Sequence, residues 1–537
     1  MFTIRTHRFM TRLVLGLTVL LATLLPARPA EAGWRSLTGV LPPHTGIYAK
    51  KFSPDSRYVV FIADIEMDDR YELYSAPTTG TLPVKLNPPL VAGGDVYSFK
   101  ITPDSRYVIY TAKQEAGDSD SDLYRAPIGG GPAVKLNIFY LSGRNVRDFK
   151  IDPDNVRVVY GAIQENDEIS ELFSVQIAGG MIVKLNPLLV AGGDVYGGFA
   201  IDPVTDRVVY LADQEVDNRV ELYGVPITGG LAVHLNSPLS RVIDFEINPQ
   251  GQGVVFRAQP NGSKSIHLFM NAPAGGLLTP LTLPLGPYQS VAGFHISPDG
   301  ARVVYNVATG TPTNPYPAYG NLYSVPIGGG LSTPLTAPAD PGYGAFYDNF
   351  IITPDGQWVV YAYQQNAMTS RVLESVSING GSRATLHNEA TGQRFNDPHL
   401  SPNGQRVVYG TYPSLQISAI PVAGGASVPL DVGFFAGITP DSSRVIFDNY
   451  DSSPFDLYSV LISGGEARNL SRTDNQVGVA DSIISPDSRW IVFEVYYPTD
   501  TIELRVSDGA EAQPPVPTPT PPPTSTVYPV YLPIIMR

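Results

Sequence analysis

The chain has 537 residues, of which 51 are glycine and 50 are proline, and 43% are hydrophobic. This much glycine and proline argues against a helical protein, and the hydrophobic content excludes a chain that is disordered throughout. The absence of cysteine excludes disulfide scaffolds, thiolate zinc sites and a cysteine nucleophile. The formal net charge of −14 disfavours nucleic acid as a partner and favours a basic partner or a cation.

Residues 1–32 are predicted to be a signal peptide. Three arginines, Arg5, Arg8 and Arg12, precede an apolar stretch from Leu13 to Leu25, and Ala30-Glu31-Ala32 follows as an A-x-A cleavage pattern. The stretch is shorter than the roughly twenty residues of a membrane span, so we expect cleavage after Ala32 and no transmembrane anchor. The mature chain is then expected in the periplasm, at the cell surface or outside the cell.

A ten-residue phrase recurs along the chain and is seen in FSPDSRYVVF from Phe52, ITPDSRYVIY from Ile101 and ISPDGARVVY from Ile296. Ten copies share a proline at the same place. These prolines are Pro54, Pro103, Pro153, Pro203, Pro249, Pro298, Pro354, Pro402, Pro440 and Pro486. Ten copies at an average spacing of about 48 residues indicate a repeat architecture.

Each copy reads as four short strands, as the second one illustrates. Tyr97–Ile101 alternates into the turn at the repeat proline, and the β-branched run Val108–Tyr110 follows. After an acidic loop come Asp122–Ile128, a glycine turn at Gly129–Gly131, and Ala133–Leu136. Four strands per repeat predict an all-β protein built from β-propeller blades, since the repeats of the rival β-solenoid are shorter.

The ends of the repeat region suggest how the blades are completed. Arg35–Phe52 aligns with Val84–Ile101, so the region begins with a fourth strand, and the tenth repeat stops after its third strand, Ile502–Val506. We expect the N-terminal strand to complete the last blade and leave no exposed edge. This 3+1 arrangement favours one ring of about ten four-stranded blades over residues 33–510, with two fused rings as the alternative.

The C-terminal segment reads as a spacer and a tail. Residues 511–526 are rich in proline and threonine and are predicted to be an extended linker. Residues 527–537 form a short apolar tail, far too short to cross a bilayer. The tail is either a terminus without a fixed structure or a recognition tag for export or envelope attachment.

The phrases at Ser297–Tyr305 and Leu322–Gly330, SPDGARVVY and LYSVPIGGG, resemble the WD40-like Pro-Asp repeats of TolB-like propellers. Similar repeats occur in the propellers of prolyl oligopeptidase and dipeptidyl peptidase relatives. The resemblance covers about residues 35–508 and implies a periplasmic or exported propeller that binds protein segments. The chain departs from TolB in having no small N-terminal domain. It departs from the peptidases in having no α/β-hydrolase domain and no G-x-S-x-G motif.

The first strand of each propeller blade lines the central channel, and alternate residues face it. The third and fifth residues before each repeat proline are therefore predicted to face the channel. The candidates are Lys51, Lys100, Lys150, Asp148, Asp244, Glu246, His295, Asp397, His399 and Asp481. They are expected either to form a polar funnel for a peptide or ligand, or to hold neighbouring blades together.

The loops between strands two and three of the first four repeats are acidic. Equivalent glutamates are followed by equivalent aspartates, and together they predict an acidic face. These residues are Glu66, Glu115, Glu165 and Glu215, then Asp68, Asp118, Asp167 and Asp217. Asp118, Asp120 and Asp122 are spaced as in calcium loops but lack the usual glycine and distal glutamate, so Ca²⁺ is a weak candidate and no other cofactor is expected.

The connections Leu86–Tyr97 and Leu185–Tyr196 are nearly identical and carry apolar residues and tyrosines. Leu90 and Val91, with Leu189 and Val190, are expected either to form a recognition surface or to pack over the blade ends.

These features predict a non-enzymatic, exported module that binds a protein segment or another envelope ligand, and no nucleic acid, through its channel and acidic face. Catalytic residues are not assigned. One alternative is a propeller glycosidase or lyase that uses channel carboxylates and histidines as acid and base. The other is a structural protein displayed at the surface by the proline-rich tail.

Overall fold

A computed structural model describes residues 33–508, apart from short internal segments. The segments left undescribed are 116–120, 138–144, 165–168, 240, 252, 283, 287, 311–318, 340–343, 365–368, 390–392, 397, 450–454 and 472–476, together with the side chains of 319 and 346–349. The predicted signal peptide, linker and tail lie outside the described residues. Within the described ranges every regular element is a β-strand, and no helix there is long and apolar enough to cross a membrane.

The first five repeats contain four strands each. Repeat one has β2 (Ile47–Phe52), β3 (Tyr58–Ala63), β4 (Glu72–Pro77) and β5 (Val84–Lys85). Repeat two has β6 (Val96–Ile101), β7 (Tyr107–Ala112), β8 (Asp122–Pro127) and β9 (Val134–Lys135). Repeat three has β10 (Val146–Ile151), β11 (Arg157–Ala162), β12 (Glu171–Gln176) and β13 (Val183–Lys184). Repeat four has β14 (Ala200–Ile201), β15 (Arg207–Ala212), β16 (Glu221–Pro226) and β17 (Val233–His234). Repeat five has β18 (Arg241–Ile247), β19 (Val254–Gln259), β20 (His267–Asn271) and β21 (Thr279–Pro280).

The later repeats follow the same plan. Repeat six has β22 (Gln289–Ile296), β23 (Arg302–Thr309), β24 (Tyr319–Pro326) and β25 (Thr333–Pro334). Repeat seven has β26 (Gly344–Ile352), β27 (Trp358–Gln364), β28 (Val372–Ser377) and β29 (Ala384–Asn388). Repeat eight has β30 (Arg394–Phe395), β31 (His399–Leu400), β32 (Arg406–Tyr412), β33 (Gln416–Pro421) and β34 (Val428–Val432). Repeat nine has β35 (Phe434–Ile438), β36 (Arg444–Asp448), β37 (Leu457–Leu461) and β38 (Arg468–Asn469). Repeat ten has β39 (Gly478–Ile484), β40 (Trp490–Tyr497) and β41 (Thr501–Asp508), and the chain begins with β1 (Trp34–Ser36).

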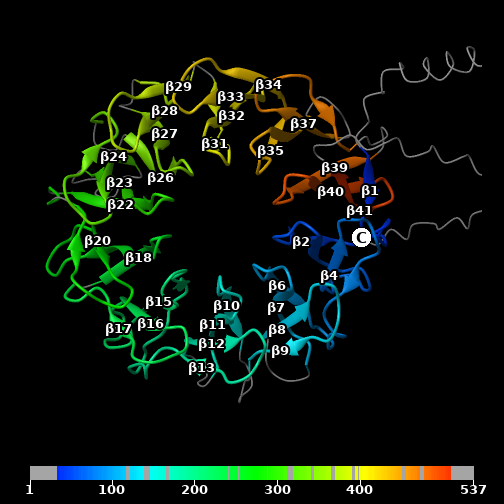
Figure 1. Cartoon of the computed structure of the whole chain (residues 1–537), viewed down its shortest axis with the longest axis horizontal. Helices are drawn as coiled ribbons and strands as arrows, with labels where there is room; N and C mark the ends of the chain where they lie inside the picture. Colours follow the sequence, from blue (N-terminus) through cyan, green and yellow to red (C-terminus); the bar gives the residue numbers. More distant parts are fainter. Residues whose placement is uncertain are drawn as a thin grey trace, which may run out of the picture.

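The strands of each repeat pair with their sequence neighbours in antiparallel sheets, most of them four-stranded. Repeats six and seven share one eight-stranded sheet, because β24 pairs with β26. Figure 1 shows the sheets following one another around a ring, with β2, β6, β10, β18, β31 and β35 toward its centre. The fold is a β-propeller.

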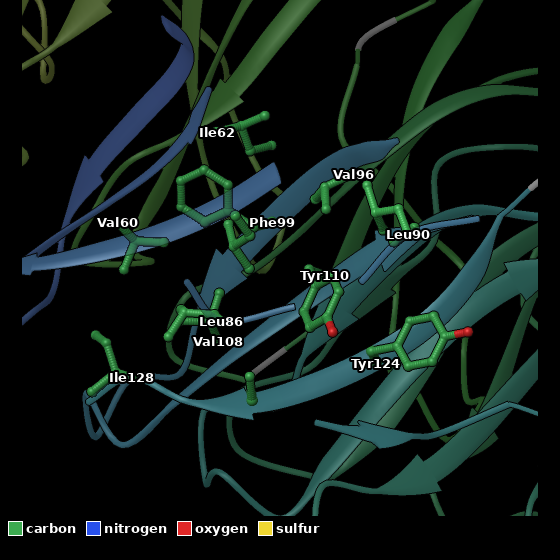
Figure 2. Close-up of a cluster of buried hydrophobic side chains, with 13 residues drawn as sticks. Val60, Ile62, Leu86, Leu90, Val96, Phe99, Val108, Tyr110, Tyr124 and Ile128 are labelled. Carbon is green, nitrogen blue, oxygen red and sulfur yellow. The ribbon is translucent and has the colours of Figure 1, made fainter. Parts of the chain in front are cut away.

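The hydrophobic core lies between successive sheets. The second strand of each repeat is apolar and buried along most of its length, because a neighbouring sheet covers each of its faces. Figure 2 shows one such layer, in which Val60 and Ile62 of β3 meet Phe99, Val108 and Tyr110 of the next repeat. Burying these side chains stabilises the fold by about 1.5–3 kcal/mol each.

The turn at the repeat proline is fastened by side chains. In repeat one the Ser53 hydroxyl donates to Asp55 Oδ1 at 2.6 Å and accepts from the Tyr58 N–H at 3.0 Å. Ser56 has a positive φ of 61°, and its hydroxyl accepts the Asp487 N–H of repeat ten at 3.1 Å. In the same way the Asp55 N–H donates to Ser105 of the next repeat at 3.0 Å. The turns therefore also link neighbouring repeats.

The first and last repeats pack against each other. β1 pairs with β41 in antiparallel register, with Trp34 opposite Ser507, which is the pairing expected from the sequence alignment. Val59 and Phe61 of β3 share a buried cluster with Val492 and Leu504 of repeat ten. The N-terminal strand therefore supplies the fourth strand of the last sheet, as a 3+1 closure requires.

Candidate functional site

The innermost strands alternate as predicted between buried aromatics and polar residues. Phe99, Phe149 and Phe199 are buried, whereas Lys51 and Asp148 are exposed and Lys100 and Lys150 are half-buried. A bulge recurs near the start of these strands, for example between Val146 and Asp148, and the alternation is regular from there to the proline turn.

Two of the three lysines reach the next repeat. The Lys100 ammonium donates to the Phe149 carbonyl, lies 3.4 Å from Asp148 Oδ1 and lies 4.8 Å from the centre of the Phe149 ring. The Lys150 ammonium lies 5.6 Å from the centre of the Phe199 ring. Burial lowers the pKa of Lys150, and the nearby Lys100 charge lowers it further, against the opposing effect of Asp148.

The histidines and acids of the inner strands also bridge repeats. His295 Nδ1 lies 2.8 Å from Glu246 Oε1 of the preceding repeat, and Glu246 Oε2 accepts the Ile296 N–H at 2.9 Å. His399 stacks on Phe435 of the next repeat, with ring centres 4.1 Å apart. Asp397, the predicted neighbour of His399, lies outside the described residues. These side chains therefore contact neighbouring repeats, and both roles expected for them, holding blades together and forming a funnel, remain predictions.

Asp244 and Asp481 each contact a cation that the sequence pattern did not single out. Asp244 accepts from Arg257 Nε at 2.8 Å, and the same guanidinium donates to the Ala292 carbonyl of the next repeat. Asp481 lies 2.5 Å from Lys50 Nζ, which is also 2.5 Å from Glu494 Oε1.

Lys50 is a polar residue at the fourth position before the repeat proline, between the positions predicted to face the channel. The side chains of Lys50 and Glu494 are both buried, and they join repeat one to repeat ten. A lysine where repeats two to four have phenylalanine was the available sequence signal. Its partner could not be predicted, because the two residues are 444 positions apart in the chain.

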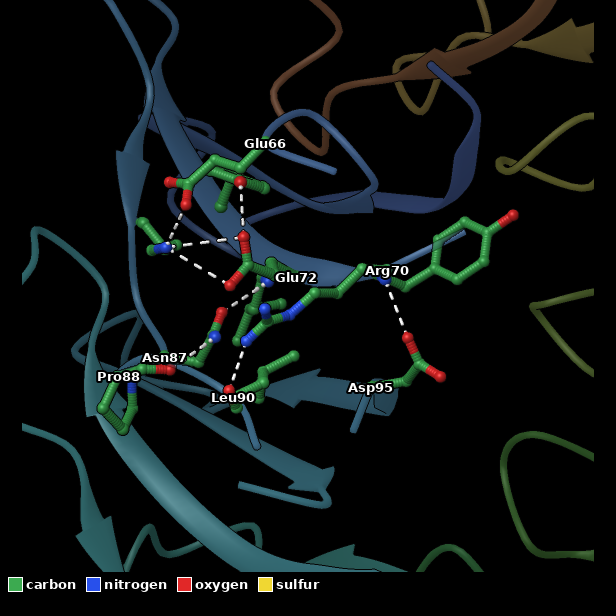
Figure 3. A network of polar contacts seen from close by, with 11 residues as sticks. Glu66, Arg70, Glu72, Asn87, Pro88, Leu90 and Asp95 are labelled. Carbon is green, nitrogen blue, oxygen red and sulfur yellow. Dashed lines mark hydrogen bonds and ion pairs between the residues drawn. The ribbon is translucent and has the colours of Figure 1, made fainter. Parts of the chain in front are cut away.

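The acidic loops are organised around one lysine in each of the first repeats. In repeat one, Lys85 Nζ lies 2.7 Å from Glu66 of the loop and 3.2 Å from Glu72 of β4, whose carboxylate is buried (Figure 3). Burial lowers the pKa of Lys85, but hydrogen bonds to Glu66 and Glu72 outweigh this effect and raise it overall.

Repeats two and three reproduce parts of this arrangement. Lys135 Nζ lies 2.9 Å from Glu115 and 2.8 Å from Asp122, and Lys184 contacts Glu171. Asp122 is buried and also accepts from Asn137 at 3.0 Å, so its carboxylate is bound to lysine and amide instead of being free for calcium. Asp118, Asp120, Glu165 and Asp167 lie outside the described residues.

Repeat four has the same two carboxylates, but a histidine takes the place of the lysine. His234 stands where Lys85, Lys135 and Lys184 stand in the first three repeats. Glu215 of the loop, Glu221 of β16 and His234 of β17 place their ligand atoms within 4.8 Å of one another. Asp217, like Asp68 in repeat one, is exposed on the loop.

A second carboxylate organises the loop itself. Asp64 accepts the Gly46 N–H at 2.6 Å and the Asp69 N–H at 3.1 Å, and its oxygens lie within 4.8 Å of those of Asp68 and Asp69. In repeat four Asp213 accepts the Asp194 N–H at 2.6 Å and the Asn218 N–H at 2.8 Å. Both aspartates are buried, and neither was among the residues predicted from the sequence.

The residues of the apolar connections differ in burial. Leu90 is buried and joins the core between repeats one and two, so it packs over the blade end. Val91, Leu189 and Val190 are half-buried, and Tyr97 and Tyr196 are exposed, so a recognition role for these residues remains a prediction.

Comparisons with known proteins found low-identity matches to solved structures. No family model matches the chain, and no curated protein matches it. Among solved structures, the tricorn protease is 10% identical over 85% of this chain and 57% of that chain, with a TM-score of 0.33. A eukaryotic initiation factor is 11% identical over 75% of this chain and 96% of that one, with a TM-score of 0.46. A putative TolB from Agrobacterium tumefaciens is 17% identical over 44% and 80%, with a TM-score of 0.28.

Proposed function

We propose that the chain is an exported, non-enzymatic binding module that takes a basic protein segment on the loop face of repeats one to four. The observation that carries the proposal is that the acidic loops have more carboxylates than lysines to neutralise them. In repeats one and two a single lysine is shared by two carboxylates, one on the loop and one on the third strand. Each group of one lysine and two carboxylates therefore carries a net negative charge.

Exposed carboxylates on the loops add to this negative charge. The side chains of Glu66 and Glu115 are 56% and 55% exposed, and Asp68 and Asp217 are exposed beside their loops. Because strands two and three are antiparallel neighbours in every repeat, these loops emerge on one face of the ring. A surface of one sign attracts a partner of the other and raises its association rate.

The export part of the proposal rests on the arginine, apolar stretch and A-x-A order of residues 1–32 and on the resemblance to TolB-like repeats. The enzymatic alternative has less support. The channel carboxylates Asp244, Glu246 and Asp481 lie against Arg257, His295 and Lys50. Carboxylates held against cationic or histidine side chains in this way are poorly placed to act as an acid and base pair.

The test compares two double variants with the same change in charge. Glu66→Gln with Glu115→Gln removes two charges from the acidic face and leaves Lys85 and Lys135 paired one to one with Glu72 and Asp122. Asp154→Asn with Glu466→Gln removes two exposed charges from the turns on the opposite face. Binding of fluorescent peptides of equal length, either Lys/Arg-rich or Asp/Glu-rich, is measured at low and at high salt.

We expect the wild type to prefer the basic peptides and to bind them more weakly at high salt. The acidic-face variant should lose about threefold to tenfold in affinity at low salt, since exposed charges contribute about 0.2–1 kcal/mol each. The opposite-face variant should bind like the wild type. Equal affinities for the two variants, or no preference for basic peptides, would contradict the proposal.

A further inference from the structure

Repeat four carries a group of potential metal ligands, two glutamates and a histidine, at a place where repeats one and two have a lysine. In repeats one and two a lysine ammonium occupies the place between the loop glutamate and the buried carboxylate. At this place repeat four has His234, and a neutral imidazole has a ring nitrogen that can bind a metal, which an ammonium lacks. Glu215, Glu221 and His234 still place their ligand atoms within 4.8 Å of one another.

The buried carboxylate of this group is held in position. The side chain of Glu221 is fully buried, and its Oε2 accepts the Tyr223 hydroxyl at 3.1 Å. Its Oε1 accepts no hydrogen bond of good geometry within the described part of the chain, but lies 3.2 Å from His234 Nε2. A buried carboxylate oxygen left in this state is costly unless a cation lies next to it.

His234 is oriented from two sides. Its ring stacks on Tyr223 with ring centres 5.1 Å apart, and its Nε2 lies 3.1 Å from Asn236 Oδ1. A ligand whose ring is fixed by packing loses little freedom when it binds a metal.

Arg219 supplies a cation to the group in this structure. Its Nη2 lies 2.6 Å from Glu221 Oε1, and its side chain is partly exposed. The equivalent arginine of repeat one, Arg70, instead donates to the carbonyl of Leu90 (Figure 3). Leu239 occupies the place of Leu90 in repeat four. In repeat one this guanidinium therefore lies away from the buried carboxylate.

We propose that Glu215, Glu221 and His234 bind a divalent transition-metal ion of the zinc type. Two carboxylates and one imidazole form a three-ligand set that Zn²⁺ accepts with water in the fourth position. Calcium and magnesium prefer oxygen ligands alone, so the imidazole selects against them. On binding, the metal replaces the charge of Arg219, which moves to the position that Arg70 has in repeat one.

The test is a calorimetric titration of untagged full-length protein with Zn²⁺, without any peptide partner. The wild type is expected to bind one equivalent that depends on His234. His234→Lys installs the residue of the first three repeats and should abolish this equivalent while the far-UV circular dichroism stays unchanged. Arg219→Gln removes the competing cation and should tighten binding several-fold.

The opposite substitution, lysine to histidine in repeat one, tests whether the histidine alone makes the site bind metal. Lys85→His places an imidazole between Glu66 and Glu72 and should add a second equivalent of Zn²⁺. Co²⁺ absorption in the visible range would report the low coordination number of each site. The same stoichiometry in wild type and His234→Lys, or no binding by the wild type at 1 mM Zn²⁺, would overturn the proposal. Because no peptide is present, this result is independent of the binding function proposed above.

Discussion

At the scale of single residues, the partner of a charged side chain decides whether that side chain stabilises the fold. The eighth residue after the repeat proline is Arg257 in repeat five, Asp448 in repeat nine and Glu494 in repeat ten. Arg257 pairs with Asp244, and Glu494 pairs with Lys50 of the next repeat. For Asp448, the next repeat has Ser482 where Lys50 stands. Burial raises the pKa of Asp448 to about 6.

This raised pKa predicts a pH-dependent stability. In the unfolded chain the Asp448 carboxyl ionises near its ordinary pKa of 3.8, whereas in the folded protein it keeps its proton up to about pH 6. The folded state therefore binds more protons between these values, and the contribution of Asp448 to stability falls as the pH rises from about 4 to 6. Asp448→Asn should raise the free energy of unfolding at pH 7 by about 1–3 kcal/mol.

Urea denaturation of wild type and Asp448→Asn at pH 4 and pH 7 checks this prediction. The difference between the two proteins should be large at pH 7 and small at pH 4. The exposed Asp154→Asn serves as the control and should show little difference at either pH. A gain in stability that is the same at both pH values would show that ionisation is not its cause.

At the scale of elements, the glycine pairs before the fourth strands serve two purposes. The turn requires a positive φ, for example 88° at Gly229 and 94° at Gly130. The same glycines also touch the fourth strand of the preceding repeat. A Cβ added at Gly229 would lie 2.6 Å from Val183 Cγ1, and one at Gly130 would lie 2.8 Å from Val84 Cγ1. The turn residue therefore also sets how closely two sheets approach.

Gly229→Ala is predicted to destabilise the protein by about 1–3 kcal/mol, because the added methyl group meets both a strained φ and a packed valine. Gly328→Ala is the matched control in a turn of the same kind, since its added Cβ has no neighbour within 4 Å and its φ is not positive. The control should change stability by less than about 1 kcal/mol. Urea midpoints of both variants measure the effect, and equal midpoints would contradict the prediction.

At the scale of the whole molecule, the contact between the first and last repeats differs from the others. Neighbouring repeats elsewhere are joined by a short connection, whereas here the chain supplies β1 to β41 and joins Lys50 to Glu494. The backbone of Gly80 approaches Arg35 of β1 as Gly130 approaches Val84 of β5. The last sheet thus uses the same packing with a strand taken from the other end of the repeat region.

Removing Lys50 should weaken this contact strongly. Lys50→Met leaves the buried Glu494 carboxylate without its cation, and the loss of one partner from a buried pair costs about 3–5 kcal/mol. Lys50→Phe combined with Glu494→Leu reproduces the Phe245 and Leu211 pair of repeats four and five and should stay close to wild-type stability. Chemical denaturation of the three proteins measures this. A Lys50→Met variant as stable as the wild type would contradict the role of the pair.

Much of the fold could be predicted from the sequence, because its signals act over a few residues. The repeat prolines marked the turns, the alternation of Phe99 with Lys100 marked the inner strands, and the alignment of the chain ends indicated the pairing of β1. The site was less predictable. Glu66 and Glu115 could be predicted as equivalent acids. The lysine that lies between each of them and a buried carboxylate could not be predicted, because no local pattern links the fourth strand to the loop.

The sequence by itself determined the repeat unit, its four strands and its turns, because period-two hydrophobicity and turn residues depend on neighbours in the chain. The tertiary structure decided the contacts that cross between strands and repeats. It placed Lys50 against Glu494, turned most of the described inner polar residues toward the next repeat, and brought His234 to two glutamates. These contacts depend on distances between segments far apart in the chain, and the hydrophobic packing of successive sheets sets those distances.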